Sequence, residues 1–141
     1  MNDMNTTPEV KSLVGATPRE IADTVAEILD NKKARDVKVI AVADKTIIAD
    51  FFVLATGNSS TQVRALTDEV EYKLGLAGLE AAHVEGRDSN SWRALDYSSV
   101  IVHIFDREAR DFYNLDKLWS DSEQIDITPI VTAEDKEDNK D

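Results

Sequence analysis

The stretch Phe51-Phe-Val-Leu-Ala-Thr-Gly-Asn-Ser-Ser60 joins an apolar run to a short polar turn. The run has the composition of a buried strand, and the Gly-Asn-Ser-Ser turn can cap a following helix. Apolar residues at helical spacing continue the pattern and two glycines end it: Val63, Leu66, Val70 and Leu74, then Gly75 and Gly78. We expect a further strand over 79–84. A strand, a helix and a strand in this order imply a right-handed parallel crossover and an α/β fold, although the strand order stays open.

The chain before this unit supplies another helix and another strand. Thr17, Pro18 and Glu20 form a capping-box sequence with proline at the first helical position. Apolar residues then recur on one face, so we expect an amphipathic helix over 18–33. Residues 37–42 are apolar, β-branched and bounded by charge, which predicts a buried strand.

The chain after this unit is expected to form a hairpin and a last helix. Residues 92–97 and 100–105 have strand character, and Ser98-Ser99 between them has the spacing of a two-residue turn. Serine is not the residue that such turns favour, so the turn type stays open. The last helix is expected over 107–119, where four apolar residues have helical spacing: Phe112, Leu115, Leu118 and Trp119.

These elements predict a single α/β domain with a mixed sheet of about five strands flanked by helices. Residues 1–16 are polar and irregular, which indicates a flexible leader, and 17–120 form the domain. Residues 121–141 are acidic and poor in aromatic side chains, so we expect a largely disordered tail in which a few isoleucines pack locally.

Composition narrows the class of function. The 141 residues carry a net charge of −12, and eight acidic and two basic residues place −6 of it in 120–141. The rest lacks the basic surface that binding to a phosphate backbone needs, although an acidic protein can still dock on a basic protein. The sequence has no cysteine and no run near the ~20 apolar residues of a membrane span, so we expect a cytoplasmic protein.

Catalytic and metal-binding patterns are weak. The turn at 57–60 could hold a phosphate on a helix N-terminus, but it lacks the lysine and the spaced glycines of known phosphate loops. Asp68, Glu69 and Glu71 could suggest a metal site, yet helical phase spreads them over the solvent side. His83 and His103 each stand alone on a strand. We therefore expect no catalytic residue, no cofactor and no metal, hence no enzyme.

Aromatic residues are concentrated near the end of the chain. Six of the nine lie within 92–119, interleaved with arginines: Trp92, Tyr97, Phe105, Phe112, Tyr113 and Trp119. For Phe112 and Trp119 we prefer burial in the core. A domain of this size cannot easily bury all of the Trp and Tyr side chains, and these types together with Arg often dominate interfaces. A partner surface in this segment is at least as good a hypothesis as a closed core.

Two separated blocks carry a more specific pattern. The first runs Ala49-Asp-Phe-Phe-Val-Leu-Ala-Thr-Gly-Asn-Ser59 and continues with Gln62-Val63. The second follows Glu85-Gly86 and runs Trp92-Arg-Ala-Leu-Asp-Tyr-Ser-Ser-Val-Ile-Val-His-Ile-Phe105, then Ala109-Arg-Asp-Phe-Tyr-Asn-Leu-Asp-Lys-Leu-Trp119. Over 18–120 this resembles the ribosomal silencing factor family (RsfS), also called the Iojap-like family. The departures are modest: Phe51 for tyrosine, Ser98-Ser99 for a Gly-Asp type of turn, Asn90 for a small residue and Asp116 for glutamate.

The resemblance implies a function and a site. Family members bind the large ribosomal subunit through ribosomal protein uL14, block association with the small subunit and repress translation when nutrients are short. They are often homodimers when free, and their fold is similar to that of nucleotidyltransferases without the catalytic carboxylates. Carried over, the partner-binding set is Trp92, Asp96, Tyr97, His103, Phe105, Arg110 and Tyr113. Asp96 would meet a basic group, and Arg110 would orient Asp96 or reach across the interface. A large-subunit assembly factor that uses the same site, and a nucleotide-binding enzyme, stay open as alternatives.

Overall fold

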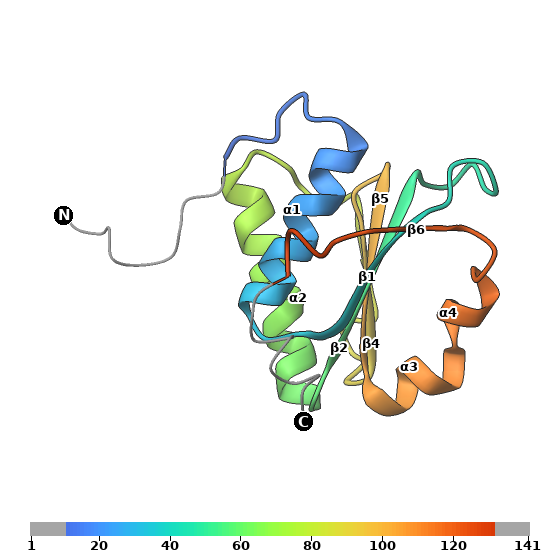
Figure 1. Ribbon diagram of the computed structural model, residues 1–141. Coiled ribbons are helices and arrows are strands. Elements are labelled where there is room, and N and C mark those ends of the chain that lie inside the picture. The colour runs from blue at the N-terminus through green and yellow to red at the C-terminus, as the bar shows by residue number, and fades with distance from the viewer. Residues whose placement is uncertain (1–10, 132–141) are drawn as a thin grey trace.

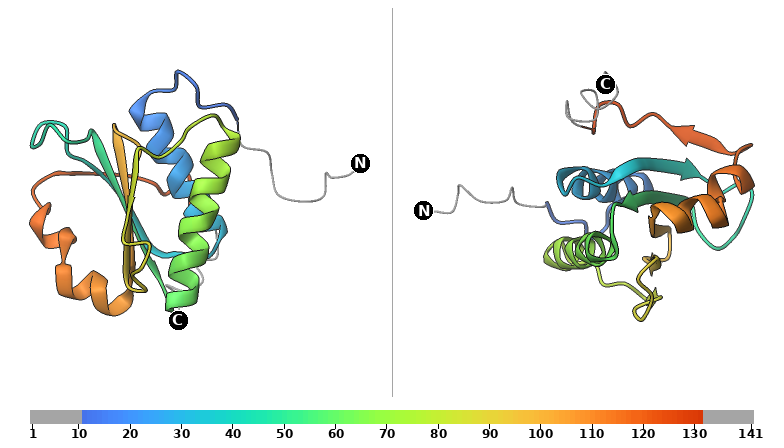
Figure 2. Two further views of the ribbon diagram at one scale, coloured as in Figure 1. Left: turned by 180° about the vertical axis from the view of Figure 1, so that it is seen from behind. Right: turned by 90° about the horizontal axis from the view of Figure 1, so that it is seen from below.

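A computed structural model describes residues 11–131 as one mixed sheet with helices on both faces (Figure 1). The six strands lie in the order β3-β4-β5-β2-β1-β6. Helices α1 and α2 cover one face, and the shorter α3 and α4 lie over the other (Figures 1 and 2). The elements are α1 (Pro18–Asn31), β1 (Arg35–Ala41), β2 (Phe51–Gly57), α2 (Ser60–Leu76), β3 (His83–Glu85), β4 (Trp92–Asp96), β5 (Val100–Asp106), α3 (Arg107–Tyr113), α4 (Leu115–Leu118) and β6 (Glu123–Ile125).

The start of α1 has the capping box that the sequence predicts. The Thr17 hydroxyl accepts a hydrogen bond from the Glu20 N–H at 3.1 Å, and the Glu20 carboxylate accepts one from the Thr17 N–H at 2.9 Å. The apolar faces of α1 and α2 form the larger core against the sheet, with fully buried side chains that include Val25, Leu29, Val63, Leu66, Val70, Leu74, Val53, Leu95, Val102 and Ile104. The predicted α/β class and both of these helices are confirmed.

The predicted parallel crossover from β2 through α2 to β3 is present, but its two strands are not neighbours in the sheet. β2 pairs in parallel with β5, whereas β3 is only three residues long and pairs antiparallel with β4 at the sheet edge. Because β4 is antiparallel to both β5 and β3, β3 runs parallel to β2 as predicted, with β4 and β5 between them in an order that the sequence left open. A central parallel strand needs apolar residues on both faces. β5 has them, but His83 and Glu85 are exposed and only Val84 between them is half-buried.

The predicted hairpin of β4 and β5 is present, and its turn has a specific conformation. Ser98 has φ 71°, and the Ser99 N–H donates to the Tyr97 carbonyl at 2.9 Å across it. The Asp96 carboxylate accepts from the Ser98 N–H at 2.7 Å. This hydrogen bond supports a serine in the left-handed region, which glycine or asparagine usually occupies.

The folded part extends beyond both predicted boundaries. Leu13 is buried and its N–H donates to the Ala77 carbonyl at 2.9 Å, so the segment assigned to a leader contributes to the core. In the segment assigned to a tail, Ile125 is buried in β6, which pairs antiparallel with β1. This is the sixth strand that the sequence did not predict. Residues 1–10 and 132–141, on which the remaining leader and tail predictions fall, lie outside the described residues.

The last helix is two helices. Asn114 adopts the left-handed conformation (φ 51°), where it ends α3, and its side chain accepts from the Lys117 N–H at the start of α4. The prediction of one helix over 107–119 was therefore wrong. The break turns α4 back toward the sheet, where Leu115 and Trp119 pack partly buried on its second, smaller core.

Candidate functional site

Six rings form one cluster on the α3–α4 side of the sheet. We call this set the aromatic cluster: Phe52, Trp92, His103, Phe105, Tyr113 and Trp119. Side chains alternate along a strand, and the β4–β5 register sets Trp92 opposite Phe105 and Ala94 opposite His103. The residues from β2, β4 and β5 thus share one sheet face, to which α3 and α4 add Tyr113 and Trp119.

Trp92 lies at the centre of these contacts. Its ring centroid is 4.4 Å from that of Tyr113 and 5.1 Å from that of Phe105, on which it stacks. Phe52 makes edge contacts with His103 at 5.2 Å and with Trp119 at 5.1 Å. Such pairs add about 0.5–1.5 kcal/mol each beyond the area that they bury. The cluster therefore holds a half-exposed tryptophan in a fixed orientation.

His103 is a structural acceptor within the cluster. Its Nδ1 accepts a hydrogen bond from the Trp92 indole N–H at 3.2 Å. Burial lowers the pKa of His103 to about 4, so the ring is neutral near pH 7 and Nδ1 is free to accept. No group of acidic or histidine residues suited to a metal ion occurs within 11–131.

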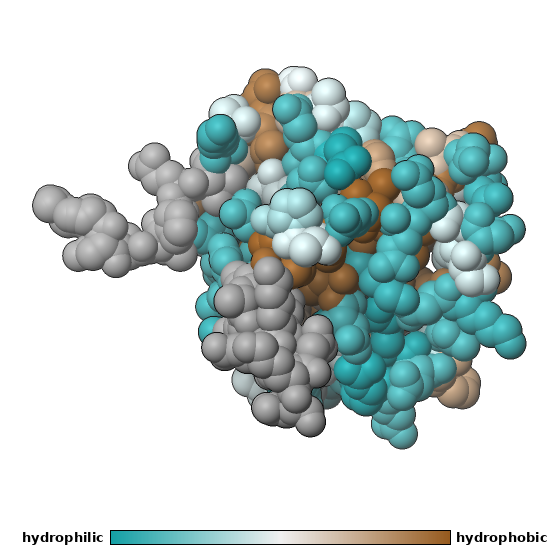
Figure 3. Space-filling model, viewed as in Figure 1, coloured by the Kyte–Doolittle hydropathy of each residue, from teal (hydrophilic) through white to brown (hydrophobic). Residues whose placement is uncertain are grey.

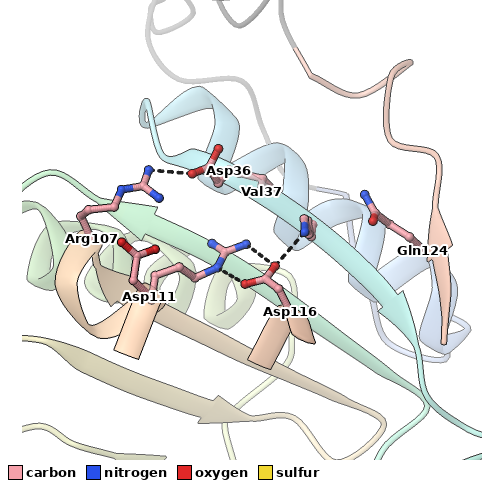
Figure 4. A pocket seen from close by; sticks show the side chains of 8 residues that line it. Asp36, Val37, Arg107, Asp111, Asp116 and Gln124 are labelled. Atoms are coloured by element: carbon pink, nitrogen blue, oxygen red, sulfur yellow. Dashed lines mark hydrogen bonds and ion pairs between the residues drawn. The ribbon is translucent and has the colours of Figure 1, made fainter. Parts of the chain in front are cut away.

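A partly buried ion network, centred on the buried Arg110, fixes α3 and α4 to the sheet beside the cluster (Figure 4). The Arg110 guanidinium donates through Nε and Nη2 to the two oxygens of Asp116 at 2.7 and 2.9 Å, and through Nη1 to the Thr56 hydroxyl at 2.8 Å. Lys38 on β1 pairs with the same carboxylate at 2.8 Å. The hydrogen bonds from Arg110 hold the pKa of Asp116 well below its usual range. Figure 4 also shows Arg107 bonded to Asp36 at the rim of this shallow pocket.

Large apolar side chains are exposed on the same side of the molecule. Phe112 is 78% exposed, Leu118 67% and Tyr113 48%. In the view of Figure 3 the surface is mostly hydrophilic, and hydrophobic areas emerge between polar ones. The expectation that Phe112 is buried was wrong because the ring lies on the outer side of α3. Trp119 is partly buried against Phe52, as expected.

The structure brings four of the seven predicted site residues together and separates the other three. Trp92, His103, Phe105 and Tyr113 belong to the aromatic cluster, in which Phe105 is fully buried at the base. Tyr97 is buried on the opposite sheet face, in the core under α1 and α2. Arg110 is buried and bonded to Asp116, so the expectation that it orients Asp96 was wrong. Asp96 lies at the far end of β4 from Trp92 and bonds to the turn.

Sequence reasoning missed Phe52 and Leu118 as parts of this side of the molecule. Phe52 could have been found from the alternation of β2, in which Phe52 and Leu54 share a face, had the β2–β5 pairing been known. Leu118 was expected on the apolar stripe of one helix over 107–119, and in α4, after the turn at Asn114, it is 67% exposed.

The catalytic alternatives find little support in the geometry. In the β2–α2 turn the Ser59 hydroxyl caps α2 by accepting from the Gln62 N–H, and the Asn58 N–H donates to the Gln62 side chain. On α2, Glu71 pairs with Arg87 at 2.7 Å, and Glu69 lies 4.0 Å from Lys73. These two carboxylates thus face different cations, as the helical phase indicates. No helix within the described residues is long and apolar enough to cross a bilayer.

Comparison with known proteins gives a consistent result. The family model described as "Ribosomal silencing factor during starvation" matches residues 15–141. The ribosomal silencing factor RsfS of Halalkalibacterium halodurans is 32% identical over 114 residues, which cover 81% of this chain and 97% of that protein. A mouse protein named mitochondrial assembly of ribosomal large subunit protein 1 is 31% identical over 101 residues, 70% of this chain and 44% of its own length. A crystal structure of a Chromobacterium violaceum protein superposes with a TM-score of 0.71 at 32% identity and covers 74% of this chain and 87% of that one.

Proposed function

Since this chain belongs to the ribosomal silencing factor family, we propose that it binds the large ribosomal subunit through ribosomal protein uL14 and represses translation. The protein would occupy the face that the small subunit must approach, so that the subunits cannot join. This mechanism is competitive and needs no chemistry. The extent of repression depends on the free concentration of the protein relative to its dissociation constant for the large subunit.

The aromatic cluster, with the exposed residues beside it, is the observation that carries the proposal. The rings of Trp92 and Tyr113 are in contact with their planes tilted by 45°, and both side chains are partly exposed to solvent. Half-exposed aromatic side chains held in one orientation lose little entropy on binding and are frequent anchors of interfaces. Phe105, His103 and Arg110 would support this surface from below, Asp96 would act at the hairpin end, and Tyr97 would support the hairpin from the core on the other sheet face.

The charge of the chain favours a basic partner. The net charge is −12, and proteins that lie on RNA are typically basic. Opposite charges would speed the encounter and suppress association with other acidic proteins. We expect the protein to act as a soluble cytoplasmic factor without a cofactor and not as an enzyme. When free, it would form a homodimer.

The first test is sedimentation of a cell extract through a sucrose gradient. The protein should travel with the large subunit and be absent from joined ribosomes, and its addition should lower the fraction of joined ribosomes. Presence in joined ribosomes, or no sedimentation with either subunit, would rule the proposal out.

The second test maps the surface. Trp92→Ala and Tyr113→Ala should each weaken binding to isolated uL14 by about 2 kcal/mol, as the loss of anchor residues does. Tyr72→Ala on α2 is the matched control, because Tyr72 is a similarly exposed tyrosine on the opposite helix layer. The proposal fails if the control weakens binding as much as the two cluster variants, provided that circular dichroism shows all three folded.

A role in assembly of the large subunit is the second candidate, and one finding favours it. The mouse relative carries large-subunit assembly in its name. The same surface would serve both roles, so binding data alone do not separate them. Depletion of the protein should leave mature large subunits intact if it acts as a silencer, and should cause incomplete large particles to accumulate if it acts in assembly.

A further inference from the structure

The loop between β1 and β2 presents two neighbouring isoleucines to solvent. Ile47 is fully exposed and Ile48 is 59% exposed, and we call this pair the loop tip. The loop is nevertheless well bonded. The Val42 N–H donates to the Asp50 carbonyl at 2.9 Å, and the Ile48 N–H donates to the Thr46 hydroxyl at 3.3 Å. Because both isoleucines are exposed, they add little to the stability of the core. The stability of the fold therefore does not explain why these two residues are apolar.

The loop tip lies on the same side of the sheet as α4. Lys45 pairs with Asp121 at 3.7 Å, which connects the loop to the segment after α4. The loop and α4 extend to the same side in the views of Figures 1 and 2. Leu118 is the exposed apolar residue of α4, and its neighbour Trp119 contacts Phe52 at the start of β2. The exposed apolar residues of α3 and α4 and the loop tip therefore lie on the same side of the sheet (Figures 1 and 2).

We propose that Ile47 and Ile48, together with Leu118, form a second apolar anchor for the basic ribosomal protein bound by the aromatic cluster. The inference rests on the proposed function. The occupant would offer an apolar depression bordered by cations, because exposed carboxylates flank the anchor: Asp44, Asp121 and Glu123. Lys45, the cation beside the loop tip, is already paired with Asp121.

Size and charge favour this occupant over others. A stable interface buries roughly 800 Å² on each partner. The exposed parts of Trp92, Phe112 and Tyr113 alone fall well short of such an area, since a few side chains supply only about 150–250 Å² each when wholly buried. In a symmetric contact through the loop tip, a second copy of this chain would set these carboxylates against one another, and an anionic lipid surface would repel them as well.

The test compares two double variants of the full chain. Ile47→Ser with Ile48→Ser removes the loop tip, and Tyr72→Ser with Leu76→Ser removes two similarly exposed apolar residues from α2 on the other face. Both should melt within a few degrees of the wild type, because exposed side chains add little to stability. We expect the loop-tip variant to bind isolated uL14 about tenfold to a hundredfold more weakly, and the α2 variant to bind within twofold of the wild type.

The outcomes separate the two proposals. If the wild type binds and Trp92→Ala weakens binding while the loop-tip variant does not, the second anchor is refuted and the proposed function stands. If the wild type itself does not bind, both are refuted. If the loop-tip variant loses self-association, measured by analytical ultracentrifugation, but keeps its affinity for uL14, the loop tip is a contact between copies and the inference is wrong.

Discussion

Replacing Asp116 with asparagine should destabilise the protein, because the buried guanidinium of Arg110 would lose its negatively charged partner. The Arg110 side chain is only 5% exposed, and its two hydrogen bonds to Asp116 carry most of its charge compensation. The substitution keeps the shape of the side chain but removes the negative charge. Arg110 then retains the Thr56 hydroxyl and one amide oxygen as acceptors. The two cations that flank the site, Arg110 and Lys38, would also lose the carboxylate between them.

The magnitude follows from the burial of the pair. Removing one partner of a buried ion pair costs about 3–5 kcal/mol. The remaining acceptors and the 24% exposure of the Asp116 side chain reduce this, so we expect a loss of about 2–3 kcal/mol in the free energy of unfolding near pH 7. Asp23→Asn is the control. Asp23 pairs with Arg19 at 3.1 Å on the surface, where such pairs contribute about 0–1 kcal/mol.

The sign of the pH dependence gives a second readout. The pKa of Asp116 is lowered in the folded state, so its contribution is fully present above the ordinary aspartate pKa of about 3.9 and is lost as pH falls below it. The difference between wild type and Asp116→Asn should be largest at pH 5–7 and shrink toward pH 2. Urea unfolding, followed by the fluorescence of Trp92 and Trp119, measures it. A difference below about 0.5 kcal/mol at pH 7, or one that does not shrink in acid, would refute the reasoning.

Two further predictions concern the cluster and a turn. Because burial lowers the pKa of His103 to about 4, the unfolded state takes up the proton first as pH falls through about 6.5, so wild-type stability should decline from pH 7 to 4. His103→Gln should flatten that decline in urea unfolding, and an unchanged slope would argue against a buried neutral ring. Gly86→Ala should cost about 2 kcal/mol or more, because φ is +82° and a Cβ would meet the Trp92 carbonyl oxygen. Gly15→Ala, where φ is +79° but no atom lies within 4 Å, should cost only about 1 kcal/mol in thermal melts, and equal losses would contradict the steric argument.

Local sequence patterns predicted the helices and strands better than they predicted which strands pair in the sheet. The capping box at Thr17, the stripe of α2 and the β4–β5 hairpin each depend on residues close in sequence, and all are present. Which strand lies beside β2 depends on the burial of the whole sheet, and no local pattern records it. The break at Asn114 was missed because the apolar spacing continues across it, and only the backbone shows the left-handed turn.

For the candidate site, the sequence predicted the clustering of the aromatic residues but not the positions of Tyr97 and Arg110. Trp92, His103, Phe105 and Tyr113 do gather, as an aromatic-rich segment indicates. Tyr97 was misplaced although the signal was available: it is an odd number of residues from Trp92 on one strand, so the two must face opposite sides. Arg110 could not be placed from sequence, because its burial depends on Asp116 and on Thr56, which is far away in the chain.

The two outermost strands of the sheet, β3 and β6, are each three residues long. An incoming polypeptide that tried to extend the ladder would find few main-chain donors and acceptors in a row. Beside β6, the uncovered end of β1 is irregular, with Asp36 at φ 51°. The short edge strands therefore disfavour aggregation by strand addition. We expect partners to bind through side chains on the two helix-covered faces of the molecule.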